Sequence, residues 1–200
     1  MEKMKNLGFD PSLFVGAITS GELTHQYQQR RDDAWFAALG RSCIHMTWSD
    51  RGAISLEGLG LRVVENICAT KRIPMVVANP DFVTVEARAL RVMPGTLAAK
   101  YEKLGGEVKL MGRPGKIIYE EAMKMAGLDA TDAVALGDSL HHDIKGANAA
   151  GIESAFISCG IHAAELGLNS FGEVADVSRV QGLASKFDAR PSFVLPAFIW

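Results

Sequence analysis

The chain has 200 residues, 48% of them hydrophobic and 22% charged, which is typical of a soluble globular protein with one or two domains. Its 21 basic and 23 acidic residues give a formal net charge of −2. A charge this close to zero provides no broad positive field for nucleic acid or an anionic membrane, so we expect neither as a partner. The three cysteines lie far apart, without the spacing of a zinc site or a disulfide framework.

The first residues of the chain do not resemble a secretory signal, because an acidic residue stands at position 2 and no apolar stretch of sufficient length follows. No segment approaches the ~18 consecutive apolar residues of a membrane-spanning helix. We therefore expect a cytoplasmic protein, while an organellar signal on a longer form of the chain stays open.

The amino-terminal part of the sequence gives the weaker structural signals. Residues 21–39 have helical character, with acidic and basic side chains mixed on a solvated face, and residues 43–48 are predicted to form a strand. The segment 63–66 passes almost at once into 67–71, which leaves little room for another element before residue 73.

The remaining sequence alternates apolar runs with helical patterns, as parallel strand–helix–strand units do. Residues 116–126 place apolar side chains at helical spacing and are followed by Gly127, so a helix is predicted there. Further strands are expected at 73–78, 107–111, 133–137 and 154–158, and further helices at 96–104 and 144–150. This order predicts an α/β fold with a doubly wound parallel sheet.

Asp138 directly follows the predicted strand 133–137 and precedes a polar loop and a helix. Ligands of open α/β sheets bind beyond the carboxyl ends of the strands, where this carboxylate would lie. Mg²⁺ prefers oxygen ligands, usually one or two carboxylates with water and substrate phosphate, so Asp138 is a candidate metal ligand. Asp138 is equally typical of a residue that begins a turn and caps the next helix. These residues alone leave both interpretations open.

Arg113 and Lys116 place two cations in the loop after another predicted strand, ahead of a helix whose amino terminus itself attracts anions. A fixed cation beside a phosphoryl group would neutralise the charge that develops on its oxygens. Taken alone, such a segment is more often a solvated surface turn, because exposed arginine and lysine are the norm.

Two other groups of polar residues have ordinary structural explanations. Asn79, Pro80 and Asp81 end a predicted strand and are typical of a turn in which the polar side chains bond their own backbone. His141 and His142 stand near the candidate metal ligand, but Mg²⁺ prefers oxygen. We therefore expect these two histidines to be exposed loop residues.

The segments GRPGKIIYEEAM and VALGDSLHHDIKGANAAGI resemble the third and fourth motifs of the haloacid dehalogenase-like hydrolase superfamily. More narrowly, VVANPDFV and the TSGE near residue 20 are similar to a subgroup with a large cap inserted between the second and third motifs. That subgroup includes sugar-phosphate, phosphoglycolate, pyridoxal-phosphate and nitrophenyl-phosphate phosphatases. The resemblance runs over most of the chain and implies a Rossmann-like core with an α/β cap.

The resemblance implies roles for individual residues. Asp138 would be a Mg²⁺ ligand, and Asp143 would help complete the site through bound water or the cation of the third motif. Arg113 stands where the superfamily usually has lysine, which keeps the charge but changes its reach and geometry, and Lys116 could partly compensate. The substrate would lie close to the turn formed by Asn79, Pro80 and Asp81.

The sequence departs from the superfamily pattern in two places. Members open with a strand ending in an Asp-x-Asp pair, of which the first residue is the nucleophile and the second the general acid, and this sequence contains no such pair. The cap would also be shortened near residues 66–67. We therefore expect an amino-terminally truncated protein in which 1–14 is a remnant of the core, 15–110 is the cap and 111–200 is the carboxy-terminal part of an incomplete core.

The expected function is Mg²⁺-dependent hydrolysis of phosphoric monoesters by a full-length form, with a small phosphorylated metabolite as the partner. We expect no activity from this chain, because a missing nucleophile is usually the most damaging loss. The alternative is a non-catalytic remnant that binds Mg²⁺, phosphate or a partner subunit, and a homo-oligomer is compatible with both. Loss of the first strand should also expose a neighbouring strand and the apolar faces of its helices.

Overall fold

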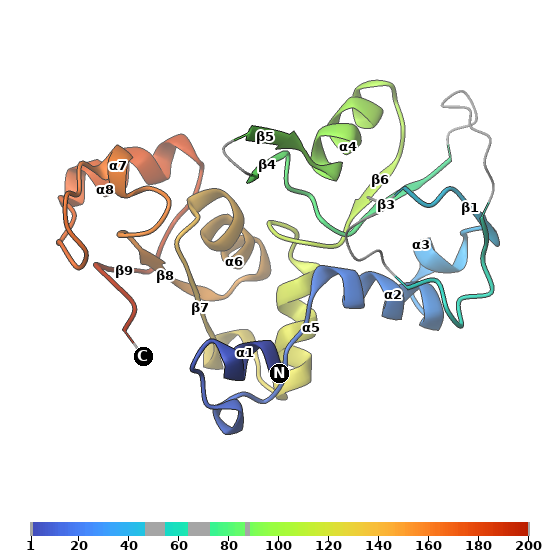
Figure 1. The fold of residues 1–200 in the computed structure, drawn as a ribbon, viewed down its shortest axis with the longest axis horizontal. Helices are drawn as coiled ribbons and strands as arrows, with labels where there is room; N and C mark the ends of the chain where they lie inside the picture. Colours follow the sequence, from blue (N-terminus) through green and yellow to red (C-terminus); the bar gives the residue numbers. More distant parts are fainter. Residues whose placement is uncertain (1, 47–54, 64–72, 87–88, 200) are drawn as a thin grey trace. The chain divides into compact units, whose positions relative to one another are not determined.

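The computed structural model of this chain describes residues 2–46, 55–63, 73–86 and 89–199. The backbone forms two units, which we treat separately (Figure 1): the terminal unit, from residues 1–17 and 113–200, and the inserted unit, from residues 18–112. Within the described ranges, no helix has both the length and the apolar character needed to cross a membrane.

The terminal unit is built on a parallel sheet in which β8 (Glu153–Ile157) lies between β7 (Val134–Gly137) and β9 (Phe193–Leu195). The register places Leu136 beside Ala155, and Ala155 beside Phe193. The helical elements of this unit are α1 (Glu2–Asn6), η1 (Pro11–Leu13), α5 (Ile117–Ala126), η3 (Ala130–Asp132), the π-helical turn η4 (Leu140–Ile144), α6 (Lys145–Ala150), α7 (Ala163–Leu166) and α8 (Val177–Lys186).

Local sequence explains where the main helices of this unit begin and end. Helix α5 stops at Gly127, which adopts the left-handed conformation (φ 67°) that glycine tolerates best, and its backbone N–H caps the last turn. Helix α8 begins after Asp176, whose carboxylate accepts a hydrogen bond from the backbone N–H of Arg179 at 3.1 Å. Both boundaries are therefore fixed by short-range chemistry.

The hydrophobic core of the terminal unit lies on one face of the sheet. Phe156 of β8 is fully buried there, against the turn η4 and helices α7 and α8. The buried cluster consists of Phe156 together with Leu140, Ile144, Leu166, Val180, Ala184 and Ala189. This cluster fixes the turn η4 to the sheet, directly after the carboxyl end of β7.

The inserted unit contains separate pairs of strands within its described residues. Strands β1 (Ser42–Cys43) and β2 (Arg62–Val63) are parallel, as are β3 (Met75–Val77) and β6 (Val108–Leu110), while β4 (Val83–Glu86) and β5 (Ala89–Val92) are antiparallel. Its helices are α2 (Ser20–Arg30), α3 (Ala34–Ala37) and α4 (Pro94–Lys103). Fully buried side chains include Leu23, Phe36 and Leu59.

The structure confirms the expected α/β fold with parallel strands, and it corrects some of the elements predicted from the sequence. The segment predicted as one strand at 43–48 forms a strand only at residues 42–43, and residues 47–54 lie outside the described part. The residues before the predicted helix at 144–150 are helical as well, because η4 leads directly into α6. The proposed shortening near 66–67 also falls outside the described residues.

Replacement of the central core residue should test how far the terminal unit depends on this one-sided core. We expect Phe156→Ala to lower the free energy of unfolding by ~3–5 kcal/mol, because it leaves a cavity beneath η4 and α8. Urea denaturation followed by circular dichroism measures the change. Phe171→Ala is the control, because Phe171 is largely exposed; equal effects of the two substitutions would contradict the assignment of this core.

Candidate active site

Asp138 stands at the carboxyl end of β7, where the strand gives way to η4. One carboxylate oxygen, Oδ2, accepts a hydrogen bond from the backbone N–H of Ile161 at 3.1 Å. The cap of η4 is the neighbouring Ser139, whose Oγ accepts a hydrogen bond from the backbone N–H of His142 at 3.1 Å. The sequence left open whether Asp138 is a metal ligand or the cap of the next helix. Because Ser139 is the cap, the second interpretation does not explain Asp138.

Asp138 borders a groove of about 500 Å³ in the terminal unit. Gly160 also lines this groove, and it approaches so closely that a Cβ atom there would come within 2.2 Å of the Cβ of Asp138. Among the described residues that line the groove, Asp138 alone is charged. The lining consists of Phe9, Phe14, Leu136, Gly137, Asp138, Ile157, Gly160 and Phe198.

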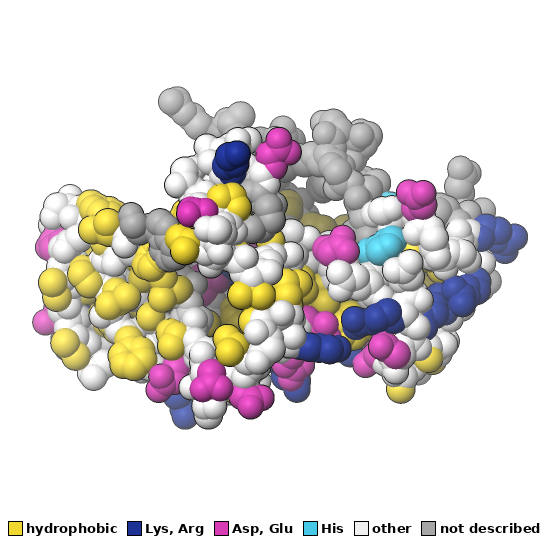
Figure 2. All heavy atoms as spheres, turned by 90° about the horizontal axis from the view of Figure 1, so that it is seen from below, with side chains coloured by type: hydrophobic (Ala, Val, Ile, Leu, Met, Phe, Trp, Pro, Cys, Tyr) yellow, Lys and Arg dark blue, Asp and Glu magenta, His cyan; other side chains and the backbone are white. Residues whose placement is uncertain are grey.

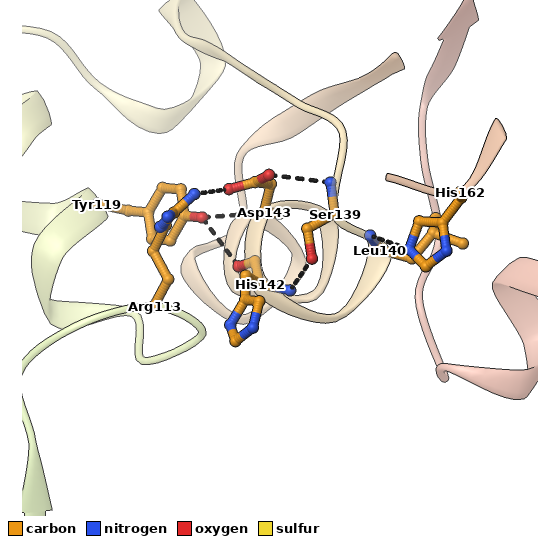
Figure 3. A network of polar contacts seen from close by, with 7 residues as sticks. All are labelled: Arg113, Tyr119, Ser139, Leu140, His142, Asp143 and His162. Atoms are coloured by element: carbon orange, nitrogen blue, oxygen red, sulfur yellow. Dashed lines mark hydrogen bonds and ion pairs between the residues drawn. The ribbon is translucent and has the colours of Figure 1, made fainter. Parts of the chain in front are cut away.

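Asp143, on η4, connects three parts of the site (Figure 3). Its Oδ1 forms an ion pair with the guanidinium of Arg113, and its Oδ2 accepts a hydrogen bond from the backbone N–H of Ser139 at 3.0 Å. The side chain of Asp143 is only 9% exposed, whereas that of Arg113 is 53% exposed. A buried carboxylate thus holds a cation whose other face is open to solvent.

Tyr119 supports the same turn from helix α5. Its hydroxyl lies 3.2 Å from the carbonyl oxygen of His142 and 3.1 Å from that of Asp143, and it donates its proton to this pair of acceptors. Burial, reinforced by the negative charge of Asp143, raises the pKa of Tyr119 to about 12. The phenol therefore remains protonated, and able to donate, over the whole physiological pH range.

His162 fixes the other side of η4. Its Nε2 accepts a hydrogen bond from the backbone N–H of Leu140 at 3.3 Å, and its Nδ1 lies 2.6 Å from Oε2 of Glu165. The hydrogen bond from His162 is the main reason why the pKa of Glu165 lies below its ordinary value. Sequence reasoning missed this residue, although the spacing of His162 and Glu165, one helical turn apart, was a signal for such a pair.

The histidines next to Asp138 are not the exposed loop residues expected from the sequence. His141 and His142 are half-buried on η4, with ring centroids 4.8 Å apart in an edge-to-face arrangement. Burial is the main cause that lowers the pKa of His141, and the proximity of His142 and Lys145 lowers it further. Burial therefore favours the uncharged form of His141.

The second cation predicted from the sequence has a different partner. Lys116 lies at the start of α5, and its Nζ contacts the carboxylate of Glu120, one helical turn along, at 2.8 Å. Among the described residues, Arg113 is the cation that pairs with Asp143. The two cations of this loop therefore engage different carboxylates.

Asn79, Pro80 and Asp81 belong to the inserted unit, directly after β3. Oδ1 of Asn79 accepts a hydrogen bond from the backbone N–H of Asp81 at 3.1 Å, as expected for a turn that bonds its own backbone. Pro80 is buried and lies against both Gly95 and Gly112. A Cβ atom on either glycine would clash with Pro80. Asn79 also borders a separate groove of about 780 Å³ in this unit, together with residues of α2 and the segment 55–58.

The candidate site offers carboxylate oxygens, the type of ligand atom that Mg²⁺ prefers. Asp138 offers carboxylate oxygens beside the groove, whereas Asp143 is engaged by Arg113 and Ser139. No group of three or more histidine, cysteine, aspartate or glutamate side chains gathers as a metal site within the described ranges. Mg²⁺ commonly uses one or two protein carboxylates and takes its other ligands from water and substrate phosphate, so Asp138 fits that role.

The contact between β7 and Asp143 can be tested with glycine variants. A Cβ on Gly137 would come within 2.3 Å of Cγ and Oδ2 of Asp143, so Gly137→Ala should displace this carboxylate and lower the free energy of unfolding by ~1–3 kcal/mol. Gly182→Ala is the control, because a Cβ there meets open space on α8. This control should be neutral or stabilising by up to ~1 kcal/mol. Equal urea denaturation midpoints for the two variants would contradict the packing described.

The carboxy-terminal segment of the chain matches a known protein family. Residues 110–180 match the family model described as HAD-hydrolase-like. This segment contains Arg113, Tyr119, Asp138 and Asp143, which together form the site described above. A comparison with curated protein sequences finds no match.

Solved structures resemble nearly the whole chain. A haloacid dehalogenase-like hydrolase from Brucella suis is 24% identical, with a TM-score of 0.68 over 99% of this chain and 78% of its own. A p-nitrophenyl phosphatase from Archaeoglobus fulgidus is 18% identical, with a TM-score of 0.66 over 98% and 77%. A glycerol phosphate phosphatase from Mycobacterium tuberculosis, solved with calcium, is 22% identical, with a TM-score of 0.60 over 96% and 56%.

The family match and the structural similarity agree on the part of the chain that forms the site. The matched segment covers the sheet strands β7 and β8 and the turn η4, which hold Asp138 and Asp143. At these levels of identity the solved structures establish the fold. The chain therefore resembles haloacid dehalogenase-like hydrolases in its matched segment, residues 110–180, and it shares the fold of these solved structures over nearly its whole length.

Proposed function

We propose that this chain carries the metal-binding and charge-neutralising part of a phosphatase that hydrolyses phosphoric monoesters of small metabolites. The observation that carries this proposal is the position of Asp138 at the carboxyl end of a parallel strand, beside a groove. Sites of open α/β sheets lie at such strand ends. A p-nitrophenyl phosphatase and a glycerol phosphate phosphatase are among the similar solved structures, which supports phosphoric monoesters as the substrate class.

Arg113 would bind the phosphoryl oxygens. Its guanidinium is anchored on one side by the buried Asp143, and slightly more than half of the side chain is exposed. An anchored arginine presents its remaining N–H donors in a fixed fork that suits phosphate. Lys116 would contribute less, because its ammonium is engaged by Glu120.

Asp138 would hold Mg²⁺ through its carboxylate oxygens. The bound cation would polarise a phosphoryl oxygen and orient the phosphate. The protein would position the Asp138 carboxylate in two ways: the backbone N–H of Ile161 binds one of its oxygens, and Gly160 packs against its Cβ. Both contacts restrict the directions in which the carboxylate can point.

The inserted unit would correspond to the cap domain. In this proposal the cap extends over residues 15–110, and residues 1–14 with 111–200 belong to the core. Asn79, Pro80 and Asp81 would help to recognise the substrate from the cap. The groove beside Asn79 supports this role, because its lining includes polar side chains, such as those of Glu22 and His25, that can bind polar groups of a substrate.

A second candidate function is non-catalytic binding of Mg²⁺ and phosphate. It is favoured by one observation: the 200-residue sequence contains no Asp-x-Asp pair that could supply the nucleophile and the general acid. In this case the chain would retain Arg113 and Asp138 as a binding site without turnover. A form of the protein that carries such a pair would then be the active phosphatase.

Hydrolysis of p-nitrophenyl phosphate by the 200-residue chain, with and without Mg²⁺, tests whether this chain is catalytic by itself. We expect no Mg²⁺-dependent turnover above that of the Asp138→Asn variant, because the sequence offers no Asp-x-Asp nucleophile. Asp188→Asn is the matched control, because the Asp188 side chain is 80% exposed and forms an ion pair with Lys145 at 3.6 Å. Turnover by wild type that Asp138→Asn abolishes and Asp188→Asn retains would show that another residue replaces the nucleophile.

Binding of inorganic phosphate in the presence of Mg²⁺ tests the site independently of turnover. We expect Arg113→Gln to weaken this binding by at least about 10-fold, because a charge-assisted hydrogen bond is lost. Isothermal titration calorimetry measures the affinity. Arg113→Lys separates loss of binding from loss of folding, because it keeps a cation beside Asp143 and should retain part of the affinity. Equal affinity in wild type and Arg113→Gln would refute the role of Arg113.

A further inference from the structure

His162 is a buried polar residue that the proposed chemistry does not use directly. Figure 2 shows hydrophobic and acidic side chains at the surface of the terminal unit. His162, by contrast, exposes only 6% of its side chain, at the amino end of α7. Its ring centroid lies 6.0 Å from that of Phe156 and 5.1 Å from that of Phe187. A polar ring in such apolar surroundings is costly unless its nitrogens are hydrogen-bonded.

The two hydrogen bonds of the ring allow only one position for its proton. The backbone N–H of Leu140 lies 3.3 Å from Nε2, and a backbone N–H can only donate, so Nε2 must be the acceptor. The proton of the neutral ring therefore lies on Nδ1, which donates it to Oε2 of Glu165 at 2.6 Å. Glu165 thus fixes the tautomer in which His162 can bind η4.

His162 directly follows the residue whose backbone holds Asp138. The backbone N–H of Ile161 donates to Oδ2 of Asp138 at 3.1 Å. The ring of His162 accepts the hydrogen bond from Leu140, two residues after Asp138 (Figure 3). Two hydrogen bonds at adjacent positions therefore join these two segments of the chain, and the carboxylate of Asp138 takes part in one of them.

We infer that His162 is a positioning residue for Asp138 and that Glu165 keeps it in the required tautomer. Without an acceptor at Nε2, the N–H of Leu140 would be buried without a partner, which is costly enough to shift the start of η4. The N–H of Ile161 would then no longer hold the carboxylate in one direction. Hydrogen bonds of this kind orient metal ligands, so for Mg²⁺ the inference rests on the proposed role of Asp138.

Asparagine and glutamine at position 162 separate positioning from packing. His162→Gln brings a carbonyl oxygen close to the place of Nε2, where it can accept from Leu140. The shorter side chain of His162→Asn reaches only the place of Nδ1, so it can contact Glu165 but not Leu140. Both variants lose the ring beside Phe156 and Phe187. A purely structural role therefore predicts equal effects for the two substitutions.

Hydrogen exchange of the Leu140 and Ile161 amides, measured by NMR on the metal-free 200-residue chain, reports the positioning. Each rate is divided by that of the Phe156 amide in β8, which corrects for changes in overall stability. We expect both ratios to be at least about 5-fold higher in His162→Asn than in His162→Gln, because an acceptor is lost. Mg²⁺ affinity, measured by calorimetry, should be lower in His162→Asn by at least about 5-fold.

Glu165→Ala tests the same relay from the surface, where folding is less at risk, because the Glu165 side chain is 44% exposed. It should raise the exchange ratio of the Leu140 amide, since nothing then holds the proton on Nδ1. Glu153→Ala is the matched control, because it removes an exposed carboxylate at the start of β8. This control should leave the ratio unchanged. Nitrogen NMR of the wild-type ring should show the proton of His162 on Nδ1.

Equal exchange ratios in His162→Asn and His162→Gln would overturn the inference, as would a wild-type ring with its proton on Nε2. If neither variant at position 162 folds, an unchanged Leu140 amide in Glu165→Ala would have the same meaning. Unchanged Mg²⁺ affinity in Asp138→Asn would instead refute Asp138 as a metal ligand. The exchange ratios, which are measured without metal, would still decide whether His162 positions Asp138.

Discussion

The buried carboxylate of Asp143 is the interaction on which the rest of the site depends. It joins the loop of Arg113 to the turn after β7, and it packs against Gly137 at the end of that strand. A buried charge is costly unless it is paired and hydrogen-bonded, and here an ion pair and a backbone N–H satisfy it. Loss of either contact would therefore disturb Asp138, which lies between Gly137 and the turn.

Hydrogen bonds and apolar packing hold the turn η4 in place. The hydroxyl of Tyr119 binds its carbonyl oxygens from α5, and the imidazole of His162 binds its first backbone N–H from the other side. The core cluster around Phe156 adds apolar packing beneath. A candidate ligand such as Asp138 thus stands on a rigid support, which is what a preorganised site for a charged substrate needs.

The sequence was sufficient to predict the elements whose signals are local. The strand before Asp138 and the helix that ends at Gly127 were predicted from apolar runs and helical spacing, because those patterns depend only on neighbouring residues. The contact of Arg113 with Asp143 joins positions 30 residues apart, and the support from Tyr119 spans 24, so no spacing rule predicts them. The half-buried state of His141 likewise results from tertiary packing of η4.

The central claim is that Asp138 and Arg113 form one site for a metal ion and a phosphate. A crystal structure of the 200-residue chain soaked with Mg²⁺ and inorganic phosphate tests it most directly. The account predicts a cation bound by the carboxylate of Asp138 and a phosphate oxygen bound by the exposed side of the Arg113 guanidinium. A cation and a phosphate bound elsewhere, with β7 and η4 folded as described, would contradict it.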